Sequence, residues 1–248
     1  MDNAIILLIL NMQSIPSEAL MVIEIIICIL TILFFLKFFG LLGIATSATI
    51  MLIAANIQIL KLAYFGWIHT EIALGTAAFA STYLISDIVT EIYGKQIAKK
   101  IVYITASAQL FFVILMIVTL GYQFSNDSSA HQSIENIFVP QIRILLVSIV
   151  SYVLSQLIDI AFFASIAKIM QGHFIWLRVN VSNFLSQIFD SILFSMLCWR
   201  IFSPDPKEIS EILFVYVIFS FIPRFFIGII ITPIIYLAKS IKRNDVFI

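Results

Sequence analysis

The chain has 248 residues, of which 62% are hydrophobic and only 11% are charged, and its formal net charge is zero. Soluble proteins carry about 25% charged residues, so this composition excludes an ordinary soluble domain and indicates an integral membrane protein. The neutral balance gives no sign of a nucleic-acid partner. The two cysteines and three histidines have neither disulfide nor metal-ligand spacing, so we expect no metal and no other cofactor.

Seven apolar stretches are long enough to cross a bilayer as helices, since about 20 residues span the hydrocarbon core. Only Gly40 separates the first two, so a six-span bundle in which the first stretch does not cross is the alternative. The loops are short, and we predict an all-α, polytopic membrane bundle that forms a single domain over residues 1–248. The stretches cover residues 19–39, 41–60, 72–92, 101–122, 144–167, 179–202 and 212–238.

Basic residues are distributed unevenly between the two ends of these stretches. The loop 123–139, on the same side as the N-terminus, contains no Lys or Arg. Because cytoplasmic loops are rich in Lys and Arg, we expect the N-terminus outside and the C-terminus inside. Lys61 and Lys207 are exceptions on the outer side. The residues expected on the inner side are Lys37, Lys95, Lys99, Lys100, Lys168, Arg178, Lys239, Lys242 and Arg243.

Two polar phrases of the same form interrupt the apolar sequence. Residues 155–159 read Ser-Gln-Leu-Ile-Asp in the fifth stretch, and residues 186–190 read Ser-Gln-Ile-Phe-Asp in the sixth. A carboxylate in the middle of a bilayer costs about 2.5–3.5 kcal/mol. Two such carboxylates therefore predict a polar site inside the bundle.

Helical spacing decides which other polar residues share a face with these phrases. Asn183, Gln187 and Asp190 follow one another at i, i+4 and i+7 and make one polar stripe. Arg224 directly follows Pro223 in the last stretch, and broken helices often line the substrate site of transporters. The expected binding residues are Asn56, Gln58, Asp87, Glu91, Gln156, Asp159, Arg178, Asn183, Gln187, Asp190 and Arg224.

Purely structural roles explain parts of this set. Glu91 is spaced to pair with Lys95 at i+4, and Arg224 is a candidate counter-ion for Asp159 or Asp190. However, Asp159, Asp190 and Arg224 together cost about 8–10 kcal/mol if unpaired in mid-membrane, so a binding cavity explains the whole set better. Its excess of carboxylates, with several amides, suits a planar heterocycle with adjacent N–H donors or a cationic amine.

A pattern of longer motifs covers about residues 45–240 and resembles the queuosine precursor transporter family, also described as vitamin uptake transporters. Its most specific parts are Asp87 to Lys95 and Arg178 to Asp190. The segments that carry the resemblance are 54–58 (Ala-Ala-Asn-Ile-Gln) with Lys61, 86–95 (Ser-Asp-Ile-Val-Thr-Glu-Ile-Tyr-Gly-Lys), 155–159, 176–182 (Trp-Leu-Arg-Val-Asn-Val-Ser), 186–191, and Thr232-Pro233 with residues 236–239 (Tyr-Leu-Ala-Lys).

The resemblance implies a bacterial inner-membrane importer of 7-cyano-7-deazaguanine, 7-aminomethyl-7-deazaguanine or queuine. It also implies a polar wall made of eight of the residues above: Asp87, Glu91, Gln156, Asp159, Arg178, Asn183, Gln187 and Asp190. The chain departs from the family pattern at four positions. Ser86 stands for Thr, Val179 for Asn, Arg224 for Lys, and Ile231 for an acid.

Three other functions are weighed against this one. A transporter of another vitamin or nucleobase-like heterocycle fits the same polar residues. An intramembrane aspartyl protease using Asp159 and Asp190 is disfavoured, because no Gly-x-Gly-Asp, Gly-x-Ser-Gly or His-Glu-x-x-His phrase occurs, and we expect no enzyme. The substrate-binding subunit of an ATP-driven importer is the third, although the chain itself lacks a P-loop.

For the mechanism, we expect a mid-membrane pocket between the third, fifth, sixth and seventh stretches, with alternating access. The small heterocyclic substrate and the lipid bilayer are the expected partners. Coupling to a proton through Asp159 or Asp190, passive facilitated diffusion and a homodimer all remain compatible with the pattern.

Overall fold

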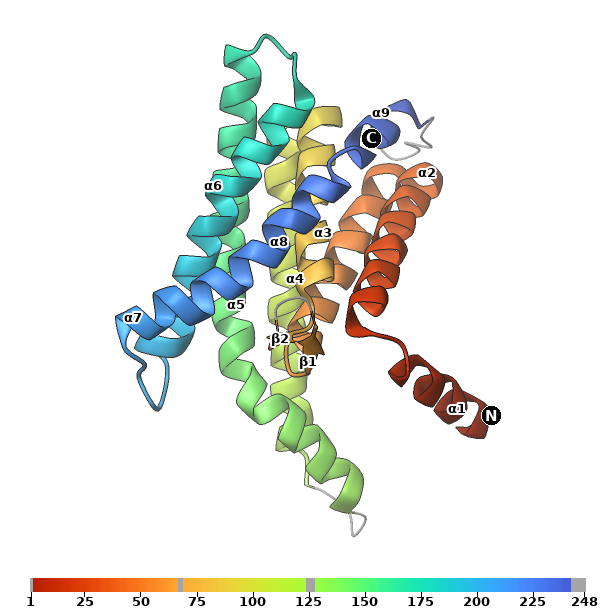
Figure 1. Ribbon diagram of the computed structural model, residues 1–248, viewed down its shortest axis with the longest axis vertical. Helices are drawn as coiled ribbons and strands as arrows, with labels where there is room; N and C mark the ends of the chain where they lie inside the picture. The colour runs from red at the N-terminus through yellow and green to blue at the C-terminus, as the bar shows by residue number, and fades with distance from the viewer. Residues whose placement is uncertain (1, 67–68, 124–127, 242–248) are drawn as a thin grey trace.

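The computed structural model describes residues 2–66, 69–123 and 128–241, and these form a helical bundle with one small hairpin (Figure 1). Five helices are long and apolar enough to cross a membrane: Ser17–Gln58, Lys95–Gly121, His131–Ile169, Ile175–Ile201 and Ile209–Ile231. The protein is therefore a multi-pass membrane protein. The helices are α1 (Asp2–Gln13), α2 (Ser17–Gln58), α3 (Thr76–Ile92), α4 (Lys95–Gly121), α5 (Ser128–Ile169), α6 (Ile175–Met196), the π-helical η1 (Leu197–Ile201), α7 (Ile209–Glu211), the π-helical η2 (Ile212–Val217), α8 (Ile218–Ile231) and α9 (Ile234–Ser240).

The first two predicted stretches, except residues 59 and 60, lie in α2, which folds back on itself at Gly40 (Figure 1). Gly40 has φ 55° and ψ −133°, a conformation that only glycine adopts easily, so the predicted break at this residue is confirmed. A Cβ atom at Gly43 would collide with the backbone of Phe35, which explains a second glycine at the fold. The two legs then pack through fully buried side chains such as Ile32 and Ile44.

The third predicted stretch begins too early, and the all-α expectation misses a strand pair. Residues 72–75 are not helical, because Thr70–Ala73 forms β2, which pairs antiparallel with β1 (Leu62–Phe65). Gly75 precedes α3 in the left-handed region with φ 90°. A Cβ there would lie 2.5 Å from the carbonyl oxygen of Ala55, so glycine allows α2 and the start of α3 to touch.

Two other boundaries are corrected. The predicted loop 123–139 is largely helical: from Ser128 onward it belongs to α5, which bends near Pro140 (Figure 1). Proline lacks the N–H that closes a helical turn, so a bend is its ordinary consequence. The last predicted stretch, 212–238, is broken, since α8 ends at Ile231 and α9 begins after Thr232 and Pro233.

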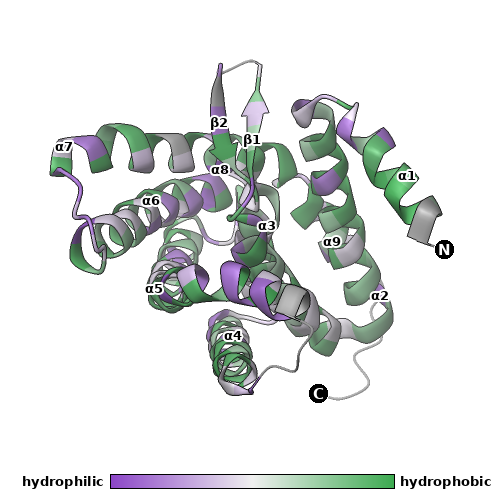
Figure 2. Ribbon diagram, turned by 90° about the horizontal axis from the view of Figure 1, so that it is seen from below, coloured by the Kyte–Doolittle hydropathy of each residue, from purple (hydrophilic) through white to green (hydrophobic). Residues whose placement is uncertain are grey.

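Helix α3 is the centre of the bundle, and it is buried along almost its whole length. It has 17 residues, or about 26 Å at 1.5 Å per residue, and its small side chains Ala77, Ala78 and Ala80 let neighbouring helices approach closely. The ribbons of the surrounding helices are mostly hydrophobic, with polar segments concentrated on a few elements (Figure 2). Their outward side chains, for example Leu30, Phe111 and Phe226, are more than half exposed, as lipid-facing residues should be.

Candidate functional site

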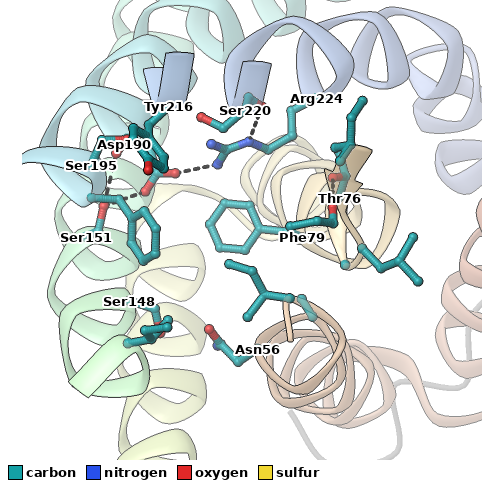
Figure 3. A pocket seen from close by; sticks show the side chains of 18 of the residues that line it. Asn56, Thr76, Phe79, Ser148, Ser151, Asp190, Ser195, Tyr216, Ser220 and Arg224 are labelled. Carbon is teal, nitrogen blue, oxygen red and sulfur yellow. Dashed lines mark hydrogen bonds and ion pairs between the residues drawn. The ribbon is translucent and has the colours of Figure 1, made fainter. Parts of the chain in front are cut away.

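A cavity of 480 Å³ opens at the end of the bundle that carries the β hairpin. Its walls come from α2, β2, α3, α5, α6, η1, η2 and α8, so residues far apart in sequence meet around it (Figure 3). Pockets for small molecules and cofactors usually measure about 300–1,000 Å³. The cavity is thus the right size for one small heterocyclic molecule.

An ion pair between α6 and α8 forms the most polar part of the cavity. The Nη1 atom of Arg224 lies 2.6 Å from Oδ2 of Asp190, and both residues are more than nine-tenths buried (Figure 3). Asp190 also accepts a hydrogen bond of 2.7 Å from the hydroxyl of Ser151 on α5. Arg224 donates further bonds to Ser191 (2.9 Å) and to the carbonyl of Ser220 (2.8 Å). Breaking this pair would leave a buried charge uncompensated, so its members depend strongly on each other.

Aromatic rings and small hydroxyls make up much of the remaining wall. Trp199 of η1 and Tyr216 of η2 stack with ring centroids 4.9 Å apart, and both face the cavity. Phe79 of α3 lies under the guanidinium of Arg224, at 5.1 Å from its centroid. Such rings stack well on a planar heterocycle, while the nearby side chains of Asn56, Ser148 and Ser195 offer hydrogen bonds.

A second polar group lies sealed inside the bundle and does not line the cavity. Asn183 of α6 donates a bond of 3.0 Å to Asp87 of α3, and Ser186 of α6 lies 3.0 Å from Asp159 of α5. Gln187 is fully buried beside them. We call Asp87, Gln156, Asp159, Asn183, Ser186 and Gln187 the sealed cluster. Every member except Ser186 has at least one polar atom with no hydrogen-bond partner among the described residues.

A third polar group ties together the opposite end of the bundle, near α9. Glu91 of α3 contacts Arg178 of α6 at 3.0 Å and Lys239 of α9 at 2.7 Å. Arg178 is 3% exposed and stacks on Phe163 of α5, with 5.0 Å to the ring centroid. This arrangement, rather than the alternative pair with Lys95, is how Glu91 is neutralised. These residues join three helices, and we call Glu91, Arg178 and Lys239 the inner ion-pair group, after the side on which the sequence analysis expects them.

The predicted binding residues thus separate into four places. Asn56, Asp190 and Arg224 line the cavity, and Asp87, Gln156, Asp159, Asn183 and Gln187 lie in the sealed cluster. Glu91 and Arg178 lie in the inner ion-pair group. Gln58 lies apart from all three, because it bonds Glu24 on the other leg of α2 at 2.9 Å. The interpretation of Arg224 as a counter-ion is confirmed for Asp190 and not for Asp159.

Comparison with known proteins identifies the family of the chain. The family described as "Putative vitamin uptake transporter" matches residues 73–238. The chain belongs to this family of membrane transporters. It is also 27% identical, over 222 residues, to the "Probable queuosine precursor transporter" of Bacillus subtilis (strain 168). That alignment covers 89% of this chain and 93% of the relative. No solved structure matches the chain.

The transporter is not an enzyme, and its substrate is a small molecule. Among the described residues, no three His, Cys, Asp or Glu side chains gather as a metal site requires.

The substitution of Arg for the expected Lys at position 224 has a structural reason. Three of its nitrogens donate to Asp190, Ser191 and Ser220 from a planar fork, which a lysine ammonium cannot reproduce.

Sequence reasoning missed the aromatic wall and most of the hydroxyls. One signal for the hydroxyls was available, because Ser148, Ser151 and Ser155 recur at three- and four-residue spacing toward Asp159 and form one polar face of α5. No comparable signal marked Trp199 and Tyr216. They lie in different apolar stretches and meet only because η1 and η2 lie side by side.

Proposed function

We propose that this transporter imports a queuosine precursor, namely 7-cyano-7-deazaguanine, 7-aminomethyl-7-deazaguanine or queuine, across the bacterial inner membrane. The observation that carries the proposal is the cavity whose wall combines one buried carboxylate, Asp190, with several aromatic rings. The printed name of the Bacillus subtilis relative supports the same substrate class.

The chemistry of a deazaguanine fits this cavity. Its guanine-like edge presents a ring N–H beside an exocyclic amine, two donors that match one carboxylate. Each oxygen of Asp190 already accepts one bond, from Ser151 or Arg224, and each has a second lone pair for the substrate. Stacking between Phe79 and the pair of Trp199 and Tyr216 would hold the ring plane.

We also propose that the cavity opens to the outside, with the N-terminus outside and the C-terminus inside. The two legs of α2 with α3, α4, α5, α6 and α8 would then make seven crossings. Lys37, Lys95, Lys168 and Lys239 belong to helix ends or loops opposite the hairpin, and this supports the orientation by the positive-inside rule. Lys242 and Arg243, also expected on the inner side, lie outside the described residues.

Alternating access follows from the order of the three polar groups. The substrate would reach Asp190 and Arg224 from the outer cavity, while the sealed cluster and the inner ion-pair group close the path to the cytoplasm. Inward opening then requires α3, α6 and α9 to separate at Glu91, Arg178 and Lys239. The break at Thr232 and Pro233, just before α9, gives the chain a place to bend.

The test is rescue of queuosine in the tRNA of a bacterial host that cannot make the precursors and lacks its own importer. The three candidate precursors are supplied separately at nanomolar concentration, with wild-type chain and with the Asp190→Asn variant at matched membrane levels. We expect rescue by at least one precursor with the wild type and none with the variant. No rescue by any precursor, with expression verified, would reject the proposed substrate class.

A second candidate is a vitamin or nucleobase of similar shape, which the description of the family favours. Competition separates the two candidates in the same cells. Adenine or hypoxanthine would have to block uptake of a labelled deazaguanine as strongly as the unlabelled deazaguanine does for the second candidate to hold. Transport by the purified chain alone in liposomes would exclude a role as one subunit of a larger importer.

A further inference from the structure

The two buried carboxyls of the sealed cluster differ from the other buried acids of the bundle. Asp190 pairs with Arg224, and Glu91 pairs with Arg178 and Lys239. Within the described part of the chain, neither Asp87 nor Asp159 forms an ion pair, although they are 1% and 0% exposed. An isolated carboxylate is very costly in such surroundings, and the usual resolution is that it takes up a proton.

The contact between Asp159 and Ser186 points to the same conclusion. The single hydroxyl proton of Ser186 has three acceptors in reach: the carbonyl of Ser182 at 2.8 Å, the carbonyl of Asn183 at 3.3 Å and Oδ1 of Asp159 at 3.0 Å. The carbonyl of Ser182 is the nearest. When the hydroxyl bonds to that carbonyl, the contact with Asp159 is a hydrogen bond only if the carboxyl carries the proton.

The unpartnered atoms around Asp159 are mainly acceptors. The side-chain oxygens of Gln156, Asn183 and Gln187, one oxygen of Asp87 and Oδ2 of Asp159 have no donor among the described residues. Gln187 is fully buried, and neither atom of its amide is bonded. Such an excess of acceptors calls for additional donors, and a proton bound to one of the carboxyls supplies a donor without needing the space of the cavity, which the sealed cluster does not line.

We propose that Asp159, with Asp87 beside it, is a proton-binding site separate from the substrate pocket, and that substrate uptake is coupled to this proton. The titratable groups that face Asp87 and Asp159 lie on α3 and α6. Asp87 repels Asp159, Arg178 of α6 acts on Asp87, and the buried Tyr83 of α3 lies within reach of both Asp159 and Asp190. Arg178, which acts on Asp87 and contacts Glu91, links the proton site with the inner ion-pair group.

In each cycle a proton from the outer water binds a carboxylate oxygen of Asp159 and leaves to the cytoplasm when the inner end opens. No other bond forms or breaks. A neutral Asp159 no longer repels Asp87, whereas a charged one does, so the two states favour different packing of α3 against α5 and α6. The coupling of the proton to substrate uptake rests on the proposed function, whereas the proton site itself does not.

The site is tested first without substrate. Infrared spectra of the full chain in liposomes are recorded over a pH series, for the wild type, Asp159→Asn, Asp159→Glu and Asp87→Asn. We expect the wild type to show a C=O band of a protonated carboxyl that titrates with pH. This band should disappear in Asp159→Asn and change its frequency in Asp87→Asn. In Asp159→Glu it should remain, at a different frequency. The same titrating band in Asp159→Asn as in the wild type would overturn the proposal.

Coupling is then measured with 7-cyano-7-deazaguanine and liposomes containing a pH dye. We expect the substrate to acidify the interior with wild type, and Asp159→Asn to lose this acidification while still exchanging labelled substrate. Glu24→Gln removes an acid held between the legs of α2 and leaves the acidification unchanged. Substrate entry without acidification, or entry that requires Na⁺, would overturn coupling to a proton. A titrating band without any substrate entry would support the proton site and count against the proposed substrate instead.

Discussion

The phrase Ser-Gln-x-x-Asp occurs in both α5 and α6, but its two aspartates have different surroundings. Asp190 faces the cavity and bonds to Arg224 at 2.6 Å, whereas Asp159 does not line that cavity and forms no ion pair within the described part of the chain. Both are almost fully buried. The difference comes from the neighbouring helix, because α8 brings a cation to Asp190 while α3 brings a second acid, Asp87, toward Asp159. The role of each phrase is therefore set by tertiary packing and not by its own sequence.

The two phrases are nevertheless linked across the α5–α6 interface. A serine of α5, Ser151, donates to Asp190 of α6, and a serine of α6, Ser186, lies against Asp159 of α5. Each antiparallel helix thus supplies an acid and a hydroxyl for the other. Because a serine hydroxyl of the neighbouring helix lies against each acid, changes at the two aspartates compare an ion-paired carboxyl with one that has no ion pair.

Asp190→Asn should have the largest effect. Removing one partner of a buried ion pair costs about 3–5 kcal/mol, because Arg224 keeps an uncompensated charge. The variant also loses the charged acceptor of the two substrate donors, and each such bond contributes about 1.5–3 kcal/mol, so we expect uptake of a deazaguanine to fall by about 100-fold or more. Initial uptake rates at matched membrane levels measure it. Wild-type uptake in this variant would mean that Asp190 serves only to hold the helices.

Trp199→Ala should weaken substrate binding without removing it. Stacking of a base on an aromatic ring is worth about 1–3 kcal/mol, so we expect the KM for uptake to rise by about tenfold. Trp199→Phe keeps a ring at the same place and is the matched control. The interpretation of the cavity as a stacking site fails if both variants raise KM equally.

Glu91→Gln should loosen the inner end of the bundle. It leaves Arg178 buried without its carboxylate, so we expect a cysteine placed at Ser182 to react several times faster with a reagent applied from the inner side. Lys95→Gln, which changes a charge at the start of α4, four residues after Glu91, should leave the labelling rate unchanged. Equal labelling rates in the wild type and both variants would mean that the inner ion-pair group does not hold the inner end of the bundle closed.

Asp159→Asn should barely change stability, in contrast to Asp190→Asn. A neutral amide resembles the protonated carboxyl in shape and charge, so we expect the free energy of unfolding in detergent to change by less than about 1 kcal/mol at low pH. At high pH the wild type must hold a charge there and the variant does not, so the variant becomes the more stable protein. Thermal unfolding at two pH values measures this, and greater stability of the wild type at high pH would indicate a structural carboxylate.

Gln58→Ala should have the smallest effect on transport. Its side chain bonds Glu24 between the legs of α2 and does not line the cavity, so we expect uptake to remain at the wild-type level. Asn56→Ala, two residues earlier on the same helix, faces the cavity and is the comparison. A loss of uptake with Gln58→Ala alone would restore the original prediction that it binds substrate.

The sequence was informative where a rule acts locally. The apolar stretches predicted the helices, and Gly40 predicted the fold within α2, because lipid leaves the backbone few alternatives and glycine marks unusual dihedral angles. The polar residues were recognised as buried because charge is costly in a membrane. Their separation into cavity, sealed cluster and inner ion-pair group could not be predicted, since it depends on which helix lies opposite each side chain. The hairpin of β1 and β2 was missed because Ile72 and Ala73 continue an apolar stretch.

The most direct test is equilibrium binding of labelled 7-cyano-7-deazaguanine to the purified wild type, Asp190→Asn and Asp159→Asn. The account predicts that Asp190→Asn loses binding, because the carboxylate at the cavity is gone. It predicts that Asp159→Asn binds with nearly wild-type affinity and no longer responds to pH. Equal loss of binding in the two variants would contradict it, because both aspartates would then belong to a single site.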